Sequence, residues 1–428
     1  MSWPTVKVEL GAGVDPTDSF LVLDDPDRGL LDVGQLAPDD GVWTDLTATI
    51  NVSSIEVTRG RRRLLEAYSR GQMTVVFDDL DATLTPFNTS SDLYPYVRPE
   101  TRIRATLTHN AVEYPLFLGF IDSVLPQLPR VDGGSRTCTI RATDAFKVLA
   151  RFDPAAASSP DGAGETTGER VARVLDNMAW PGGDRALDDG LSTVQATTLA
   201  QNALTECQLA ADSEYGELFV DAEGKIVFRD RHSRWERTES QVVQATFTDA
   251  NTAGALHYES LDVPALDAEL VKNRVSIAAV GGAAAVSTDA TSRATYFERT
   301  WNRHDLVFDG GDAESQQYAD QVVFFHKDPE QRVDGIRLKA HGSSPNALWA
   351  AMYGLGFGDQ VRAVRTLTGD DLDDYLFVEG VQHTIRAQGR TFETTLQTSS
   401  AAKFVAGIFI LDSATLGVLD QNTLAASY

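Results

Sequence analysis

Residues 102–121, RIRATLTHNAVEYPLFLGFI, decide the fold class of this chain. Within this stretch, residues 102–108 and 114–121 are short runs rich in Ile, Thr, Leu and aromatic side chains, a composition typical of β-strands. Similar runs cover residues 50–57, 72–77 and 136–142. Turn-like stretches such as DDLD at 78–81 and DGG at 132–134 separate them. Several short strands without a long helix predict a small barrel or sandwich.

The same β pattern returns near the other end of the chain, in runs at 274–280, 335–340, 360–367, 375–385 and 391–398. Between the two β blocks lies a segment with helical signals. It has a capping box, Thr166 with Glu169, followed by apolar residues at helical spacing. A second helix is expected over 198–211 and a hairpin over 217–229, and one further helix at 313–326 interrupts the second β block.

These signals predict a mainly β protein with an α/β insert. Two β-barrel-like domains flank a small α+β module, and extended arms lie at both ends. The expected divisions are an N-terminal arm at 1–45, a first β-barrel domain at 46–153, an α+β insert at 154–270, a second β-barrel domain at 271–400 and a C-terminal docking tail at 401–428. The arm is expected because residues 1–45 hold ten acidic residues against two basic ones and are broken by Gly and Pro.

The two ends share a repeat. Residues 23–37 and 411–425 align without a gap, and seven of fifteen positions are identical. Glycine permits a bend, Asp caps a turn, and spaced leucines can fill shallow apolar pockets. We therefore predict that both ends carry a docking segment, although chance recurrence of Leu-Asp turns is the alternative. Its residues are Leu23, Asp24, Gly29, Leu31, Asp32 and Leu36, with Leu411, Asp412, Gly417, Leu419, Asp420 and Leu424.

Composition narrows the class of function. The 428 residues include 37 Lys and Arg against 62 Asp and Glu, a formal net charge of −25, which disfavours nucleic-acid binding as the main activity. No apolar run is long enough to cross a bilayer, and no signal peptide is apparent at the start. The two cysteines and seven histidines have no metal-ligand spacing, and no nucleophile elbow or Walker loop occurs. The sequence therefore predicts no catalytic, cofactor or metal site.

Two clusters of charge remain. The only basic cluster in the sequence consists of Arg59, Arg61, Arg62 and Arg63. For this cluster, ion pairing between subunits is favoured over contact with nucleic acid. The acidic residues Asp370, Asp371, Asp373 and Asp374 are candidates for a surface that repels DNA phosphates, with an ordinary solvated turn as the alternative. Calcium binding by Asp-rich turns is left open, although none has EF-hand spacing.

Several short motifs resemble the minor tail proteins of actinobacterial siphophages. They are IEVTRGR at 55–61, GQMTV at 71–75, TPFN at 85–88, YPYVRP at 94–99, LFLGFID at 116–122, ATDAFKVL at 142–149, DAEG at 221–224, FRDR at 228–231, GDQV at 358–361 and FVEGV at 377–381. Each motif is short, but together they run in order along nearly the whole chain.

The resemblance implies a non-enzymatic structural protein of the virion tail tip, made in the host cytoplasm and similar to the baseplate hub proteins of tailed phages. Such hubs are usually homotrimers whose paired β-barrels build a pseudo-sixfold ring. Expected partners are the distal tail protein, the tape measure protein and the tip or receptor-binding proteins, with DNA passing through without specific binding. Three alternatives stay open: a carbohydrate-binding receptor-recognition protein, a hexameric ring protein of the distal-tail type, and a wall hydrolase.

Overall fold

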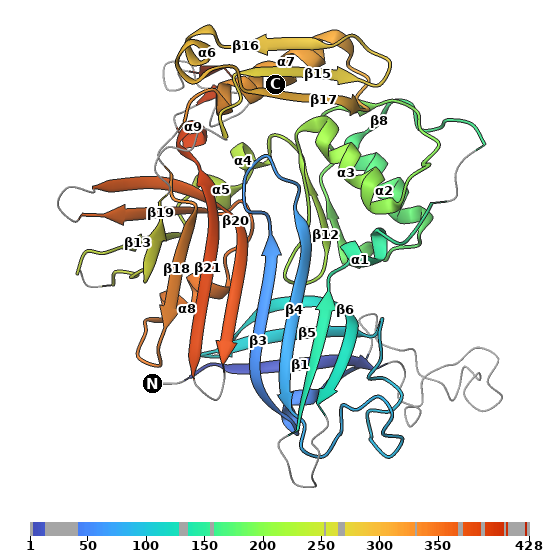
Figure 1. The fold of residues 1–428 in the computed structure, drawn as a ribbon, viewed down its shortest axis with the longest axis vertical. Coiled ribbons are helices and arrows are strands. Elements are labelled where there is room, and N and C mark those ends of the chain that lie inside the picture. The colour runs from blue at the N-terminus through green and yellow to red at the C-terminus, as the bar shows by residue number, and fades with distance from the viewer. Residues whose placement is uncertain are drawn as a thin grey trace.

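The computed structural model describes residues 3–12, 42–127, 136–154, 158–251, 254–263, 270–329, 332–366, 371–386 and 390–405, with two short strands at 408–409 and 424–425. Its dominant feature is a thirteen-stranded, mostly antiparallel sheet (Figure 1). Along the sheet the strands run β14 (Ser260–Asp262), β18 (Gly335–Ala340), β21 (Thr391–Ser400), β20 (Leu372–Arg386), β3 (Asn51–Gly60), β4 (Ser69–Asp78), β7 (Thr137–Thr143), β6 (Val112–Gln127), β5 (Arg102–His109), β1 (Thr5–Ala12) and β2 (Val42–Asp45). Strand β19 (Gln360–Arg365) pairs with β20, and β13 (Ala245–Thr248) pairs with β19 in parallel.

The strands form because their apolar residues alternate. In β3, Val52, Ile55 and Val57 are buried, and in β4 the buried residues are Met73, Val75 and Phe77. These side chains belong to one continuous core that extends from β1 to β21. The two β blocks of the sequence therefore share a single interior.

The pairing of β3 with β20 joins the two β blocks. Its register runs from Gly60 opposite Gly380 to Ile55 opposite Ile385. Within the described residues, no strand pairing closes either block into a barrel. The mainly β architecture with an α/β insert is confirmed, whereas the closed barrel is not observed among the described strands. The outer side of β3, at the edge of the first block, pairs with β20 of the second block and so is not available to close the first block on itself.

The insert packs against one side of this sheet, with its two main helices side by side (Figure 1). Helix α2 (Thr167–Asn177) begins with the predicted capping box of Thr166 and Glu169. The predicted hairpin is also present, as β11 (Glu217–Val220) and β12 (Ile226–Arg229). The remaining elements are α1 (Phe146–Leu149), β8 (Glu165–Thr166), β9 (Arg185–Leu187), β10 (Thr193–Val194), α3 (Ala203–Glu214), α4 (Ser233–Glu236) and α5 (Thr238–Gln241), with 3-10 turns at Gly182–Asp184 and, before β3, Leu46–Ala48.

A separate small unit lies at the top of the molecule in Figure 1. Its three-stranded sheet has the order β16 (Ala285–Thr288), β15 (Arg274–Ala279), β17 (Thr300–Leu306). Helix α7 (Gly311–His326) covers one face and forms a second core with Val275, Ile277 and Val322. Helix α6 (Ala290–Tyr296) belongs to the same unit, whereas α8 (Asn346–Tyr353) packs beside β18 and α9 (Ala402–Val405) beside β20.

Three of the expected divisions differ from the strand pairing. Residues 274–326, expected within the second barrel, form the separate unit, because β15 pairs with β16 and β17 and with no strand of the main sheet. Strands β13 and β14, expected in the insert, lie in the main sheet. Strand β1, expected within the arm, pairs with β5, because Val8 and Leu10 are buried in the main core and the buried Glu9 is compensated by Arg104 and Lys7. No helix in the described part of the chain is long and apolar enough to span a membrane.

Candidate functional site

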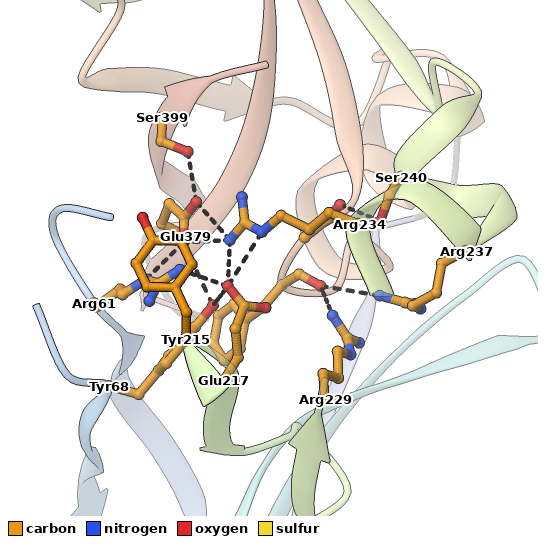
Figure 2. A network of polar contacts seen from close by, with 12 residues as sticks. Arg61, Tyr68, Tyr215, Glu217, Arg229, Arg234, Arg237, Ser240, Glu379 and Ser399 are labelled. Carbon is orange, nitrogen blue, oxygen red and sulfur yellow. Dashed lines mark hydrogen bonds and ion pairs between the residues drawn. The ribbon is translucent and has the colours of Figure 1, made fainter. Parts of the chain in front are cut away.

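The feature that connects the parts of the fold is a buried network of charged side chains, shown in Figure 2. Arg61 follows the end of β3 and Glu379 lies in β20, so these two come from the two β blocks. Glu217 begins β11 and Arg234 lies in α4, so these two come from the insert. All four side chains are at most 8% exposed.

Glu379 is the centre of this network. Arg61 donates from Nε to Oε2 of Glu379 at 2.7 Å, and Arg234 lies 2.8 Å from Oε1. Ser399 of the neighbouring strand donates to the same Oε1 at 2.5 Å. The Glu379 carboxylate therefore ties β20 to β21, to the β3–β4 hairpin and to the insert.

Glu217 completes the network from the other side. Its Oε1 accepts from Nη2 of Arg61 and from Nη2 of Arg234, both at 2.5 Å. Burial alone would raise the pKa of Glu217, but Arg234 and Arg61 outweigh burial and lower this pKa to about 2. Two arginines thus balance two glutamates, so these four buried side chains carry no net charge.

Aromatic rings pack against both arginines of the network. The guanidinium of Arg61 lies 4.3 Å from the ring centre of Tyr68, and that of Arg234 lies 4.7 Å from the ring centre of Phe377. Tyr68 also reaches Glu379 through its hydroxyl at 3.4 Å. Such contacts strengthen a buried cation without adding further charge. The ion pairs and ring contacts together hold the β3–β4 hairpin, β20 and the insert in one fixed arrangement.

The arginines of β12 and the following turn extend the network toward β19. Arg229 donates to the carbonyl oxygen of Phe357 at 2.5 Å, and Ser240 donates to that of Gly358 at 2.8 Å (Figure 2). Gly358 has a positive φ of 79°, as this tight turn requires. The glycine-rich stretch 354–359 is thus a turn into β19.

A pocket of about 880 Å³, open solvent included, lies beside the network. Arg61, Glu217 and Arg234 contribute to its wall, and so do Trp235 and Trp301. Two of the six tryptophans, which the sequence shows as dispersed, therefore line one pocket. Across the described residues, no group of three or more His, Cys, Asp and Glu side chains could hold a metal ion.

The basic cluster divides into an inner and an outer pair. Arg59 is buried, and burial lowers its pKa to about 10. Arg61 forms its ion pairs within the chain. Arg62 is exposed and Arg63 is half-buried, and both line a second pocket. The intersubunit role of the basic cluster stays a prediction, and we assign it to Arg62 and Arg63.

The predicted acidic residues lie at the start of β20 as far as they are described. Asp373 forms an ion pair with Arg362 at 2.6 Å, so part of its charge is balanced. Asp374 is half-buried, and burial raises its pKa. Asp371 is exposed, while Asp370 lies outside the described residues.

The docking segments fall almost entirely outside the described residues. Leu424 is the exception, because it begins β23 (Leu424–Ala425), which pairs in parallel with β22 (Ile408–Phe409). The sequence prediction missed Glu217, Arg234 and Glu379 as a site. The signal was present for Glu379, since a carboxylate stands inside the apolar strand sequence YLFVEGV at 375–381.

A buried histidine near the β3–β20 junction makes stability depend on pH. His383 of β20 lies opposite Val57, and its Nδ1 is 3.0 Å from Oγ1 of Thr394. Burial, assisted by the charge of Arg59, lowers the pKa of His383 to about 3. In the unfolded chain this pKa is about 6.5, so the unfolded state binds the extra proton between these values and stability falls as pH falls.

We expect the variant His383→Asn to lose less stability on acidification than the natural chain. Below pH 6.5 the difference should grow by about 1.4 kcal/mol per pH unit, since one group titrates only in the unfolded state. Urea unfolding at pH 7, 6 and 5 measures it, and all other titrating groups cancel in the comparison. Parallel losses in both proteins would show that His383 is protonated in the folded state.

The fold matches two solved tail proteins over nearly its whole length. The tail protein from Neisseria meningitidis MC58 aligns with a TM-score of 0.55 and 12% identity, covering 93% of this chain and 97% of that one. The 43 kDa tail protein of prophage MuSo2 from Shewanella oneidensis aligns with a TM-score of 0.53 and 13% identity, over the same shares of the two chains. No protein-family model matches the sequence, and no curated protein matches it either.

These likenesses show that the chain has the fold of these tail proteins. The tail-protein fold implied by the sequence motifs is thereby confirmed. An origin in an actinobacterial siphophage stays a prediction.

Proposed function

We propose that this chain is a structural protein of a phage tail, a hub-like ring component at the tail tip. In this role it joins the tail tube or the distal tail protein to the tip or receptor-binding proteins, and it adjoins the tape measure protein. The observation that carries the proposal is the likeness in fold to two tail proteins over 93% of the chain. The order of the sequence motifs supports the same role.

The buried network supports a role in an assembly, because it fixes the two β blocks and the insert relative to one another. A ring component must hold its two β blocks at a fixed angle, because each block occupies its own position around the ring. Here one carboxylate, Glu379, contacts both the β3–β4 hairpin and the insert. A homotrimer with two β blocks per chain would present six similar positions to a sixfold tube.

The negative charge of the chain supports passage of DNA through such a ring. At a net charge of −25, an inner wall of carboxylates would repel phosphates over a Debye length of about 8 Å. The acidic residues between positions 370 and 374 are the proposed part of this wall. Asp371 contributes most directly, because Asp373 shares its charge with Arg362.

The proposed docking segments give a testable consequence. Deleting residues 408–428 should leave thermal unfolding unchanged, because Phe404 and the third core cluster lie before the cut and β22 pairs with β23 alone among the described strands. Incorporation into tails should fall at least about tenfold, since two buried leucines contribute roughly 3–6 kcal/mol before ordering costs. Quantitative immunoblotting of purified tails measures this, and normal incorporation would count against docking.

The proposal itself is tested by imaging tails that contain the chain. We expect a closed ring of three copies at the tip. Six copies in the ring would favour the distal-tail type instead, and a position outside the tail would remove the structural role altogether.

A further inference from the structure

The loop between β4 and β5, residues 79–101, is held in one conformation by its own side chains. Asp79 accepts hydrogen bonds from the backbone of Thr83 at 2.7 Å and of Leu84 at 3.2 Å. Ser91 donates to the carbonyl of Thr83 at 2.7 Å. Leu84 and Val97 are buried in the main core beneath the loop. The loop is therefore ordered before it meets any partner.

This ordered loop presents an aromatic side chain to solvent. Phe87 is 89% exposed, the highest value of any large apolar residue in the described part of the chain. Its neighbour in sequence, Pro86, and the half-exposed Tyr94 line one small hollow on the same loop. An exposed aromatic on a preordered loop is the arrangement of an anchor residue, because little entropy remains to be lost when it docks.

The surroundings of Phe87 are acidic. Asp81 and Asp92 are both exposed on the same loop. Between residues 79 and 100 there are four carboxylates against a single arginine. A surface that receives this loop should therefore offer an apolar cup with a basic rim.

The second pocket has that character. Its volume is about 690 Å³, open solvent included, and Leu64, Phe325 and Phe404 contribute apolar wall. Arg62, Arg63, Arg332 and Lys403 supply four cations around it, against Asp328 and Asp334. His326 also lines it but stays neutral, since burial lowers its pKa to about 3. Its lining combines apolar side chains that an aromatic ring could contact with an excess of positive charge that favours carboxylates, although Arg332 is itself paired with Asp334.

The loop and the pocket lie at opposite ends of one molecule. In Figure 1 the β4–β5 loop is at the bottom, whereas α9, whose Phe404 lines the pocket, is near the top. One chain therefore cannot bring its own loop to its own pocket. Two different surfaces that fit each other on separate copies generate a head-to-tail contact, which can close into a ring.

We propose that Phe87 of one copy docks into the second pocket of the next copy, with Asp81 and Asp92 facing its arginine rim. The inference rests on the proposed ring and names the surfaces that form it. It assigns the intersubunit role of the basic cluster to Arg62 and Arg63. The contact is between unlike surfaces, so Phe87 does not meet Phe87.

Cysteine cross-linking tests this contact in the full chain. The two natural cysteines, Cys138 and Cys207, are buried. Only the introduced cysteines are therefore expected to form disulfides between chains. Ser90→Cys places a thiol three residues from Phe87, and Ser400→Cys places one on the wall of the pocket. At about 100 μM, above the Kd of a weak interface, mild oxidation of an equal mixture should yield a covalent dimer.

Neither variant oxidised alone should give this dimer, because like surfaces do not meet. The matched control is Ser159→Cys, an exposed serine of the insert, mixed with Ser400→Cys. The proposal is overturned if the mixture gives no dimer, or no more than this control gives.

Charge exchange then separates a direct contact from misfolding. Asp81→Lys with Asp92→Lys on the Ser90→Cys chain should lower the cross-linking rate at least about tenfold. Arg62→Glu with Arg63→Glu on the Ser400→Cys chain should restore it, which a damaged fold could not do. Phe87→Ala on the Ser90→Cys chain should lower the cross-linking rate by a similar factor. The Arg62→Glu and Arg63→Glu exchange on the other chain should not restore this rate. An unchanged rate in these variants would contradict the proposal.

Failure of this contact and failure of the proposed function give different results. A chain that forms a closed ring in tails but gives no mixed cross-link removes only this inference. A chain that cross-links as expected but is absent from tails removes the proposed function and leaves the contact standing.

Discussion

Replacing Glu379 by glutamine is expected to lower the free energy of unfolding by about 3–5 kcal/mol. The change keeps the shape of the side chain but leaves Arg61 and Arg234 buried with one carboxylate, Glu217, between them. Removing one partner of a buried ion pair leaves an uncompensated charge in a low-dielectric interior, which is the costly case. Chemical denaturation of the purified chain measures the loss.

The matched control is Asp373→Asn, which breaks the exposed ion pair with Arg362. The Arg362 and Asp373 side chains are 36% and 52% exposed, so the free energy of unfolding should fall by less than about 1 kcal/mol. Equal losses in the two variants would mean that the Glu379 network is solvated, and that it does not fix the two β blocks to the insert.

Replacing Gly60 by alanine is expected to cost about 2–5 kcal/mol, or to prevent folding. Gly60 ends β3 at the junction with β20, with a φ of +102°. An added Cβ would lie 2.4 Å from the carbonyl oxygen of Glu379 and 2.4 Å from Cα of Gly380. Backbone strain and steric overlap then act together, and the neighbouring backbone cannot move without breaking the β3–β20 pairing.

Gly164→Ala measures the cost of backbone strain at a positive φ without steric overlap of the added Cβ. Gly164 also has a positive φ, +79°, but nothing lies within 4 Å of the added Cβ. Its cost should be about 1–2 kcal/mol, measured in the same denaturation series. If Gly60→Ala is no worse than Gly164→Ala, the junction between the β blocks is looser than described.

Local signals in the sequence predicted local structure well. Thr166 and Glu169 form a capping box because their spacing alone satisfies the first backbone amides of α2. The hairpin β11–β12 forms around Asp221, whose carboxylate accepts from the backbone of Glu223 and of Lys225 at 2.9 Å. Both depend on residues within a few positions of each other.

Long-range pairing was not predictable in the same way. Nothing within residues 50–60 indicates that β3 pairs with β20, more than 300 residues later. The alternation of apolar residues gives the buried face of a strand but not its neighbour. The two β blocks were therefore expected as separate barrels, although β3 of the first block pairs with β20 of the second.

The buried network shows the same limit. Arg61 was counted with Arg62 and Arg63 as one basic cluster, because they are adjacent in sequence. In the structure, burial separates them: Arg61 meets Glu217 and Glu379, while Arg62 is exposed. Charge in a sequence does not reveal its partner when that partner comes from another part of the chain.

Electron cryomicroscopy of intact tails, at a resolution that traces the chain, can show whether the chain is the proposed ring component of the tail tip. We expect a closed ring of three copies around the DNA path, in which each copy keeps the β3–β20 pairing between its two β blocks. Tails that contain no copy of the chain, or a single copy outside any ring, would contradict it.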